Sequence, residues 1–99
     1  MKKITPEELR QWSKDNKSFI LIDVRETWEH EHYNIGGRNI PVGEIMLLRN
    51  EIPKDEDVIV YCEKGIRSSI VIQRLETIGY HNLYNLTGGM SAWKATINI

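Results

Sequence analysis

The chain has 99 residues, of which 40% are apolar and 27% are charged. This length suits one hydrophobic core, so we predict a single domain over residues 1–99. The net charge of −1 argues against general attraction to nucleic acid or anionic lipid, so any anion site must come from local geometry. One cysteine cannot form an internal disulfide, and the sequence has neither a signal peptide pattern nor an apolar run of membrane-spanning length. We therefore expect a cytoplasmic protein that makes no contact with a membrane, and a monomer is the default.

The first half of the sequence predicts a helix, a buried strand and a loop. Thr5 is placed to cap the helix, with Pro6 at its first position and Glu8 closing a capping box. The apolar run FILIDV, residues 19–24, predicts a buried strand. The helical or turn-like segment RETWEHEH comes next, followed by the glycine-rich loop NIGGRNIPVGE, in which RNIP can form a short strand.

The second half predicts two helices around a second pair of strands. EIMLLRNEI predicts a short helix, and VIVY, residues 58–61, predicts another buried strand. The helix after it ends at Gly79 and has four apolar residues on roughly one face: Ile70, Val71, Leu75 and Ile78. NLYNL can form a last strand and GGMSAWKA starts a last helix. The alternation of strands and helices predicts an α/β domain whose mainly parallel sheet is covered on both faces.

The only cysteine, Cys62, lies between the second buried strand and a helix, in the sequence CEKGIRS. Ligands of parallel sheets bind beyond the carboxyl ends of the strands. The helix N-terminus, the flexible Gly65 and the charges of Lys64 and Arg67 all favour an anion there. Ser68 can cap the helix or donate to that anion. These surroundings favour a thiolate, so we interpret Cys62 as a nucleophile rather than an inert buried side chain.

The spacing of this loop separates two kinds of thiolate chemistry. Phosphatase-type loops follow Cys-x5-Arg, whereas only four residues separate Cys62 from Arg67. The smaller cradle suits a sulfur atom carried on the cysteine better than a phosphate beside it.

Four segments, in this order, resemble the motifs of single-domain rhodaneses, which are sulfurtransferases: LIDVRETWE, GGRNIP, VIVYCEKGIRS and LTGGMSAW. The resemblance covers nearly the whole chain. It implies a rhodanese-like three-layer domain, with a five-stranded, mainly parallel sheet flanked by helices. It also implies that the cysteine carries a persulfide, taken from a donor such as thiosulfate and passed to cyanide in an assay, or to a thiol or protein in the cell.

The resemblance also assigns roles to residues of this sequence. Cys62 is the nucleophile and sulfur carrier. The loop that follows it cradles the persulfide and the sulfite-like anion, and it consists of Glu63, Lys64, Gly65, Ile66, Arg67 and Ser68. Within it, the backbone N–H groups of residues 63–67 form the cradle, while Lys64 and Arg67 attract the anionic donor.

Asp23 and Arg25 match the DxR of the family motif. We expect Asp23 to support the loop by accepting hydrogen bonds, and Arg25 to pair with a carboxylate such as Glu29. The segment HYNIGGRNIP departs from the family pattern, because its usual histidine falls on Tyr33 or Asn34 and a glycine replaces the usual alanine. The resemblance therefore does not extend to what this segment contributes to the rim of the pocket.

No metal or cofactor is expected. His30 and His32 lie two residues apart, whereas ligands on one helical face lie three or four apart. Persulfide transfer needs no cofactor. Because the chain has no second thiol, the acceptor must come from outside, as a small thiol, cyanide or a protein.

Three other functions remain open from the sequence. One is a persulfide carrier or partner-binding module with little thiosulfate turnover, which needs the same cradle. Another is a phosphatase or an arsenate-reductase-like enzyme, against which the short loop and the lack of a second cysteine argue. The last is a non-catalytic interaction domain, which would not need Cys62.

Overall fold

The structure, a computed structural model, describes residues 1–97. Its strands are β1 (Lys2–Ile4), β2 (Ile20–Asp23), β3 (Arg38–Asn39), β4 (Val58–Tyr61) and β5 (Leu83–Leu86). Its helices are α1 (Pro6–Lys14), α2 (Thr27–His32), α3 (Ile66–Glu76) and α4 (Gly89–Ile97). Two short 3-10 turns, η1 (Val42–Glu44) and η2 (Arg49–Glu51), connect β3 to β4.

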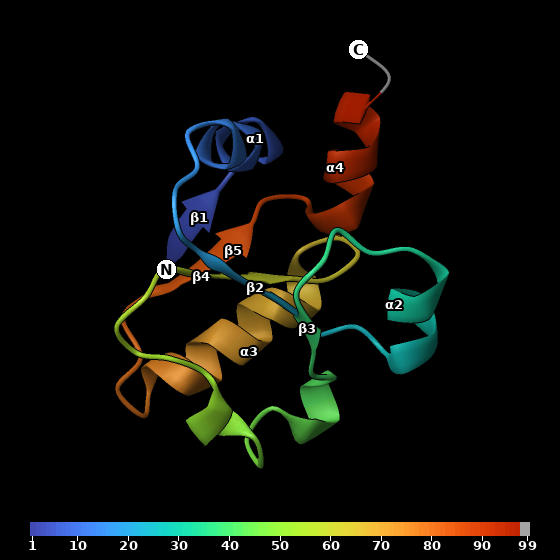
Figure 1. Ribbon diagram of the computed structural model, residues 1–99. Helices are drawn as coiled ribbons and strands as arrows, with labels where there is room; N and C mark the ends of the chain where they lie inside the picture. Colours follow the sequence, from blue (N-terminus) through green and yellow to red (C-terminus); the bar gives the residue numbers. More distant parts are fainter. Residues whose placement is uncertain (98–99) are drawn as a thin grey trace.

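The five strands form one sheet in the order β1-β5-β4-β2-β3, and every neighbouring pair is parallel. Figure 1 shows α3 on one face of this sheet and α1 with α4 on the other. The three-layer α/β architecture expected from the sequence is therefore confirmed.

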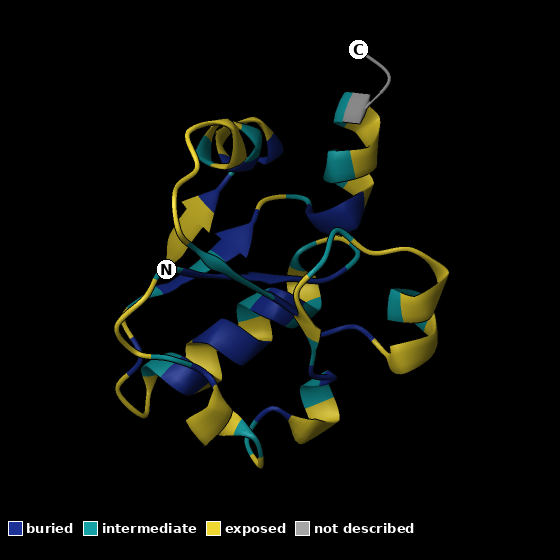
Figure 2. Cartoon of the chain, viewed as in Figure 1, coloured by how far each residue is buried: buried dark blue, intermediate teal, exposed yellow. Residues whose placement is uncertain are grey.

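The central strand β4 explains why VIVY is an unbroken apolar run. All of its residues are buried (Figure 2). Side chains alternate across a strand, so Val58 and Val60 pack in the core beneath α3, whereas Ile59 and Tyr61 pack against α1 and α4. A strand with a core on each face has no polar positions.

Helix α1 begins as its sequence predicts. The Thr5 hydroxyl accepts a hydrogen bond from the backbone N–H of Glu8 at 3.1 Å. The Glu8 carboxylate in turn accepts one from the N–H of Thr5 at 3.0 Å. The capping box therefore satisfies donors that the first turn of a helix leaves free.

Two predictions about helices are wrong. The segment EIMLLRNEI does not form one helix; it contains the last residue of η1 and all of η2, and Leu47 between them is 81% exposed. On α3, Ile70 is 41% exposed, and Ile78, just beyond the helix, is 40% exposed. The buried face is instead Ser68, Val71, Ile72 and Leu75. Ser68, although polar, belongs to the buried face in place of Ile70, because it faces the cysteine.

The chain turns in opposite directions after β2 and after β4. Strand β2 leads to β3 on one side of the sheet, and β4 leads to β5 on the other. The crevice between the carboxyl ends of these two adjacent strands is the usual ligand site of such sheets. Asp23 ends β2 and Cys62 directly follows β4, so both reach this crevice. The longest helix of residues 1–97 has 11 residues, too short to cross a membrane.

Candidate active site

The thiol of Cys62 lies over the N-terminus of α3. Its Sγ accepts a hydrogen bond from the N–H of Gly65 at 3.1 Å and lies 3.4 Å from both the N and the Oγ of Ser68. Gly65 caps the helix with φ of 95°, in the left-handed region that glycine adopts without strain. Cys62 is only 1% exposed. The sulfur therefore sits among inward-pointing N–H groups at the positive end of the helix dipole.

Asn85 on β5 links two residues of this loop, Gly65 and Ser68. The Ser68 hydroxyl donates to Asn85 Oδ1 at 2.6 Å, and Asn85 Nδ2 donates to the carbonyl of Gly65 at 3.1 Å. Asn85 is not among the site residues predicted from the sequence. An amide inside the otherwise apolar run LYNL was the signal that could have found it, since a buried amide needs hydrogen-bond partners.

The start of α4 holds the other side of the loop. The N–H of Met90 donates to the carbonyl of Cys62 at 2.9 Å, and the N–H of Ser91 donates to the carbonyl of Glu63 at 2.9 Å. A Cβ atom on Gly89 would lie 2.4 Å from the Cys62 carbonyl oxygen. A glycine is therefore required for this close approach, which explains part of the LTGGMSAW segment.

Asp23 and Arg25 form a buried ion pair beside the loop. The Arg25 Nη2 lies 2.9 Å from Asp23 Oδ2, and Arg25 and Asp23 are 2% and 0% exposed. Burial by itself lowers the pKa of Arg25, but the hydrogen bond and charge of Asp23 outweigh it and raise the pKa overall. Arg25 Nη1 also lies 3.4 Å from Glu63 Oε1.

This arrangement corrects the expectation for Asp23. Its carboxylate accepts hydrogen bonds from Arg25 and lies 2.8 Å from His30 Nδ1, and among residues 1–97 it accepts none from the cysteine loop. Support for the loop passes instead from Asp23 through Arg25 to Glu63. Asn39 adds to this by donating to the carbonyls of Asp23 and Arg25 at 3.0 and 2.9 Å.

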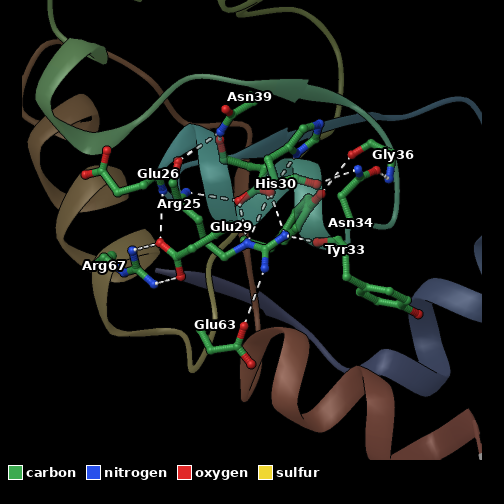
Figure 3. A network of polar contacts seen from close by, with 12 residues as sticks. Arg25, Glu26, Glu29, His30, Tyr33, Asn34, Gly36, Asn39, Glu63 and Arg67 are labelled. Carbon is green, nitrogen blue, oxygen red and sulfur yellow. Dashed lines mark hydrogen bonds and ion pairs between the residues drawn. The ribbon is translucent and has the colours of Figure 1, made fainter.

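Arg25 pairs with carboxylates, as expected, but they belong to Asp23 and Glu63 and not to Glu29. Glu29 on α2 instead accepts two hydrogen bonds from Arg67, at 2.7 and 2.9 Å (Figure 3). These bonds lower the pKa of Glu29 to about 2, and the hydrogen-bonded Glu29 carboxylate raises the pKa of Arg67. Arg67 thus joins α2 to the loop. Lys64 is exposed and has no ion-pair partner among residues 1–97.

A pocket of 290 Å³ opens over the cysteine. It is lined by Cys62, Glu63, Lys64, Ile66 and Arg67. Within the described part of the chain, the atypical segment HYNIGGRNIP contributes no lining residue. It contacts the site indirectly, because the Tyr33 carbonyl accepts a hydrogen bond from Arg25 Nη2 at 2.6 Å.

The glycine that replaces alanine in that segment has a local cause. A Cβ atom on Gly37 would lie 2.3 Å from the Leu21 carbonyl oxygen, and its φ is +84°. Across residues 1–97, no three side chains of His, Cys, Asp or Glu gather as a metal site would require.

Comparison with known proteins identifies the family of the chain. The family model of the rhodanese-like domain matches residues 5–96. The uncharacterized protein YqhL of Bacillus subtilis is 40% identical over 98% of this chain and 75% of its own length. Thiosulfate sulfurtransferase GlpE of Coxiella burnetii is 33% identical over 88% of this chain and 83% of its own.

A solved structure extends the agreement to the fold. The crystal structure of a rhodanese-like domain protein from Staphylococcus aureus superposes with a TM-score of 0.86. It is 34% identical, over 94% of this chain and 91% of that one. The chain belongs to the rhodanese-like domain family.

Proposed function

We propose that this protein is a sulfurtransferase that forms a persulfide on Cys62 and passes its outer sulfur to an external acceptor. The Cys62 thiolate attacks the outer sulfur of thiosulfate or another sulfane-sulfur donor. With thiosulfate, the S–S bond of the donor breaks and its electron pair leaves on sulfite. The product is a persulfide on Cys62. Cyanide, a small thiol or a protein thiol then takes the outer sulfur and returns Cys62 to the thiolate.

The observation that carries this proposal is the position of Sγ over the loop. The N–H groups of Gly65 and Ser68 lie 3.1 and 3.4 Å from the sulfur. Both favour negative charge there, in the thiolate before transfer and in the persulfide after it. The name of the Coxiella burnetii relative also fits thiosulfate as a donor.

The size of the site supports sulfur rather than phosphate chemistry. The loop has one residue fewer between cysteine and arginine than a phosphatase loop. The Arg67 guanidinium, which would hold a phosphate in such a loop, already has two hydrogen bonds to Glu29. Efficient hydrolysis of an aryl phosphate by the purified protein would contradict this assignment.

The test is the intact mass of the protein after incubation with thiosulfate, measured without reductant. We expect a gain of one sulfur atom that is absent in Cys62→Ser and is discharged by cyanide as thiocyanate. If neither thiosulfate nor a low-molecular-weight persulfide adds sulfur to Cys62, the proposed activity is wrong.

A second candidate is a persulfide carrier that turns over thiosulfate poorly. The engagement of Arg67 by Glu29 favours it, since Lys64 is then the loop cation left to attract a small anionic donor. A carrier would take sulfur readily from a protein persulfide and slowly from thiosulfate. Comparing the two loading rates on the same sample separates the candidates.

A further inference from the structure

A groove of 720 Å³ runs beside the cysteine loop, between α3 and β1. Ile66, Ile70 and Gln73 line its α3 side, and Lys3 lines its β1 side. It adjoins the pocket over Cys62, because Lys64 and Ile66 line both. The proposed chemistry of a small donor anion makes no use of this groove.

The groove exists because the sheet is wider than the helix that covers this face. Helix α3 packs against β4 and β5, while β1 extends the sheet beyond β5 (Figure 1). Lys3 lies beside Asn85 in the β1–β5 register, so both side chains share the face on which α3 lies. Figure 2 shows β1 largely exposed at this edge.

Helix α3 presents a second apolar face to this groove. Ile66 and Ile70 are 69% and 41% exposed and lie one helical turn apart, with Gln73 following on the same face. The helix therefore has one apolar face in the core and another in solvent. Neighbouring exposed apolar side chains beside a reactive group indicate a contact surface.

The charge of the groove is positive although the net charge of the chain is −1. Lys3 and Lys64 line it, and no aspartate or glutamate of the described residues does. Within residues 1–97 neither lysine forms an ion pair. An occupant that combines negative charge with an apolar side chain would complement this surface.

We propose that the groove docks a short acidic segment, bearing an apolar side chain, of the protein that accepts sulfur from Cys62. The proposal rests on the proposed function, since it names the partner of the same site. From Ile66 to Gln73 the helix rises about 10 Å, which an extended segment of about three residues matches. The two isoleucines favour a polypeptide, whose side chains can cover them, over a small anionic thiol.

The transfer step needs no added oxidant or reductant. A thiolate of the docked protein attacks the outer sulfur of the Cys62 persulfide. The S–S bond breaks, its electron pair returns to the Cys62 sulfur, and the outer sulfur becomes a persulfide on the acceptor. One sulfur–sulfur bond forms as another breaks, so the step is balanced.

The test uses two six-residue peptides, each with one cysteine and one leucine, whose flanking residues are glutamate in one and lysine in the other. Persulfide-loaded protein, freed of excess thiosulfate, is mixed with each peptide, and peptide persulfide is followed by mass spectrometry. We expect the acidic peptide to react about tenfold faster, an advantage that shrinks as salt is raised.

Matched variants locate the effect. Lys3→Glu should slow transfer to the acidic peptide about fivefold. Lys2→Glu makes the same charge change on the other face of β1, where Lys2 lies over the Tyr84 ring, and should leave the rate within about twofold. Ile70→Ser should slow it about fivefold, whereas Ile78→Ser, equally exposed but outside the groove lining, should not. Discharge by cyanide should be unchanged in all four variants.

Equal rates for the two peptides, or equal effects of Lys3→Glu and Lys2→Glu, would overturn the proposal. The proposal would also be overturned if Lys3→Glu and Ile70→Ser slowed sulfur transfer to glutathione as strongly as transfer to the peptide. The groove would then serve a small anionic thiol.

If Cys62 cannot be loaded with sulfur, that result contradicts the proposed function and does not test the groove. The groove is therefore also tested with Cys62→Ser and a serine version of the acidic peptide. Backbone amide NMR shifts should change at Lys3 and Ile70 and not at Ile78. Absence of these shifts at millimolar peptide would overturn the proposal without any sulfur chemistry.

Discussion

Arg67 and Glu29 form a two-pronged ion pair between the cysteine loop and α2, with N–O distances of 2.7 and 2.9 Å. The partners are 38 residues apart in the chain. A residue expected to face an anionic donor is thus also a structural contact, and it joins α2 to the cysteine loop.

Replacing Glu29 with glutamine tests what this pair contributes. Because Arg67 lowers the pKa of Glu29 from 4.5 to about 2, the ionised pair stabilises the folded state above pH 4.5. That stabilisation is lost as the pH falls from 4.5 to about 2. We expect Glu29→Gln to lower the free energy of unfolding by about 1 kcal/mol at neutral pH, a value that allows for solvent screening of the partly exposed pair.

Urea denaturation of wild type and variant at several pH values measures this effect. The difference between them should be constant above pH 4.5 and shrink toward pH 2. Glu31→Gln, on the same helix but exposed, is the matched control and should cost almost nothing. A difference that does not change with pH would exclude the ion pair as its source.

Replacing Asp23 with asparagine should be far more costly. It leaves the Arg25 guanidinium, whose side chain is 3% exposed, with less than its full compensating charge. We expect the free energy of unfolding to fall by about 3 kcal/mol, measured by urea denaturation. Asp57→Asn breaks a pair with Lys17 whose side chains are 29% and 41% exposed, and it should cost under about 1 kcal/mol. Equal costs would contradict the role of the buried pair.

Asn85→Ala should reduce both stability and sulfur loading. It removes the acceptor of the Ser68 hydroxyl and the donor to the Gly65 carbonyl. We expect a loss of about 2 kcal/mol from buried groups left without partners, and loading of Cys62 about tenfold slower in the mass assay. Asn82→Ala, just before β5, also removes two hydrogen bonds but lies at the far end of the strand. Slower loading in that variant too would indicate a general loss of stability.

Gly89→Ala should damage the loop through sterics alone. The added Cβ would lie 2.4 Å from the Cys62 carbonyl oxygen, at a φ of +59°. We expect about 3 kcal/mol of destabilisation in thermal or urea unfolding. Gly43→Ala is the control, because no atom lies within 4 Å of its added Cβ. It should change stability by less than about 0.5 kcal/mol.

The sequence predicts the parts of the fold that local physics determines. β4 is a continuous apolar run, and Thr5 with Glu8 forms a capping box that needs no tertiary contact. β1 was not predicted, because its residues Lys2 and Lys3 are polar and only Ile4 is buried. Its strand conformation comes from pairing with β5, more than seventy positions later in the chain.

The candidate site likewise has one part that the sequence predicts and another that it does not. Cys62, Gly65 and Ser68 lie within one short loop, so their mutual geometry follows from a strand, a tight turn and a helix N-terminus. The sequence does not predict the partners of the charged residues. Glu29 could pair with Arg25 or Arg67, and only the fold, which places Arg25 beside Asp23, decides between them. Spacing along the chain carries no information about which pair is formed.

The contacts of Met90 and Ser91 with the carbonyls of Cys62 and Glu63 have a consequence for biosynthesis. Residues leave the ribosome in chain order, so the loop emerges while the segment that holds it is still inside the exit tunnel. The nascent thiol is therefore present before its cradle is complete. The loop around Cys62 therefore cannot reach its final geometry until Met90 and Ser91 have also been synthesised and have left the ribosome.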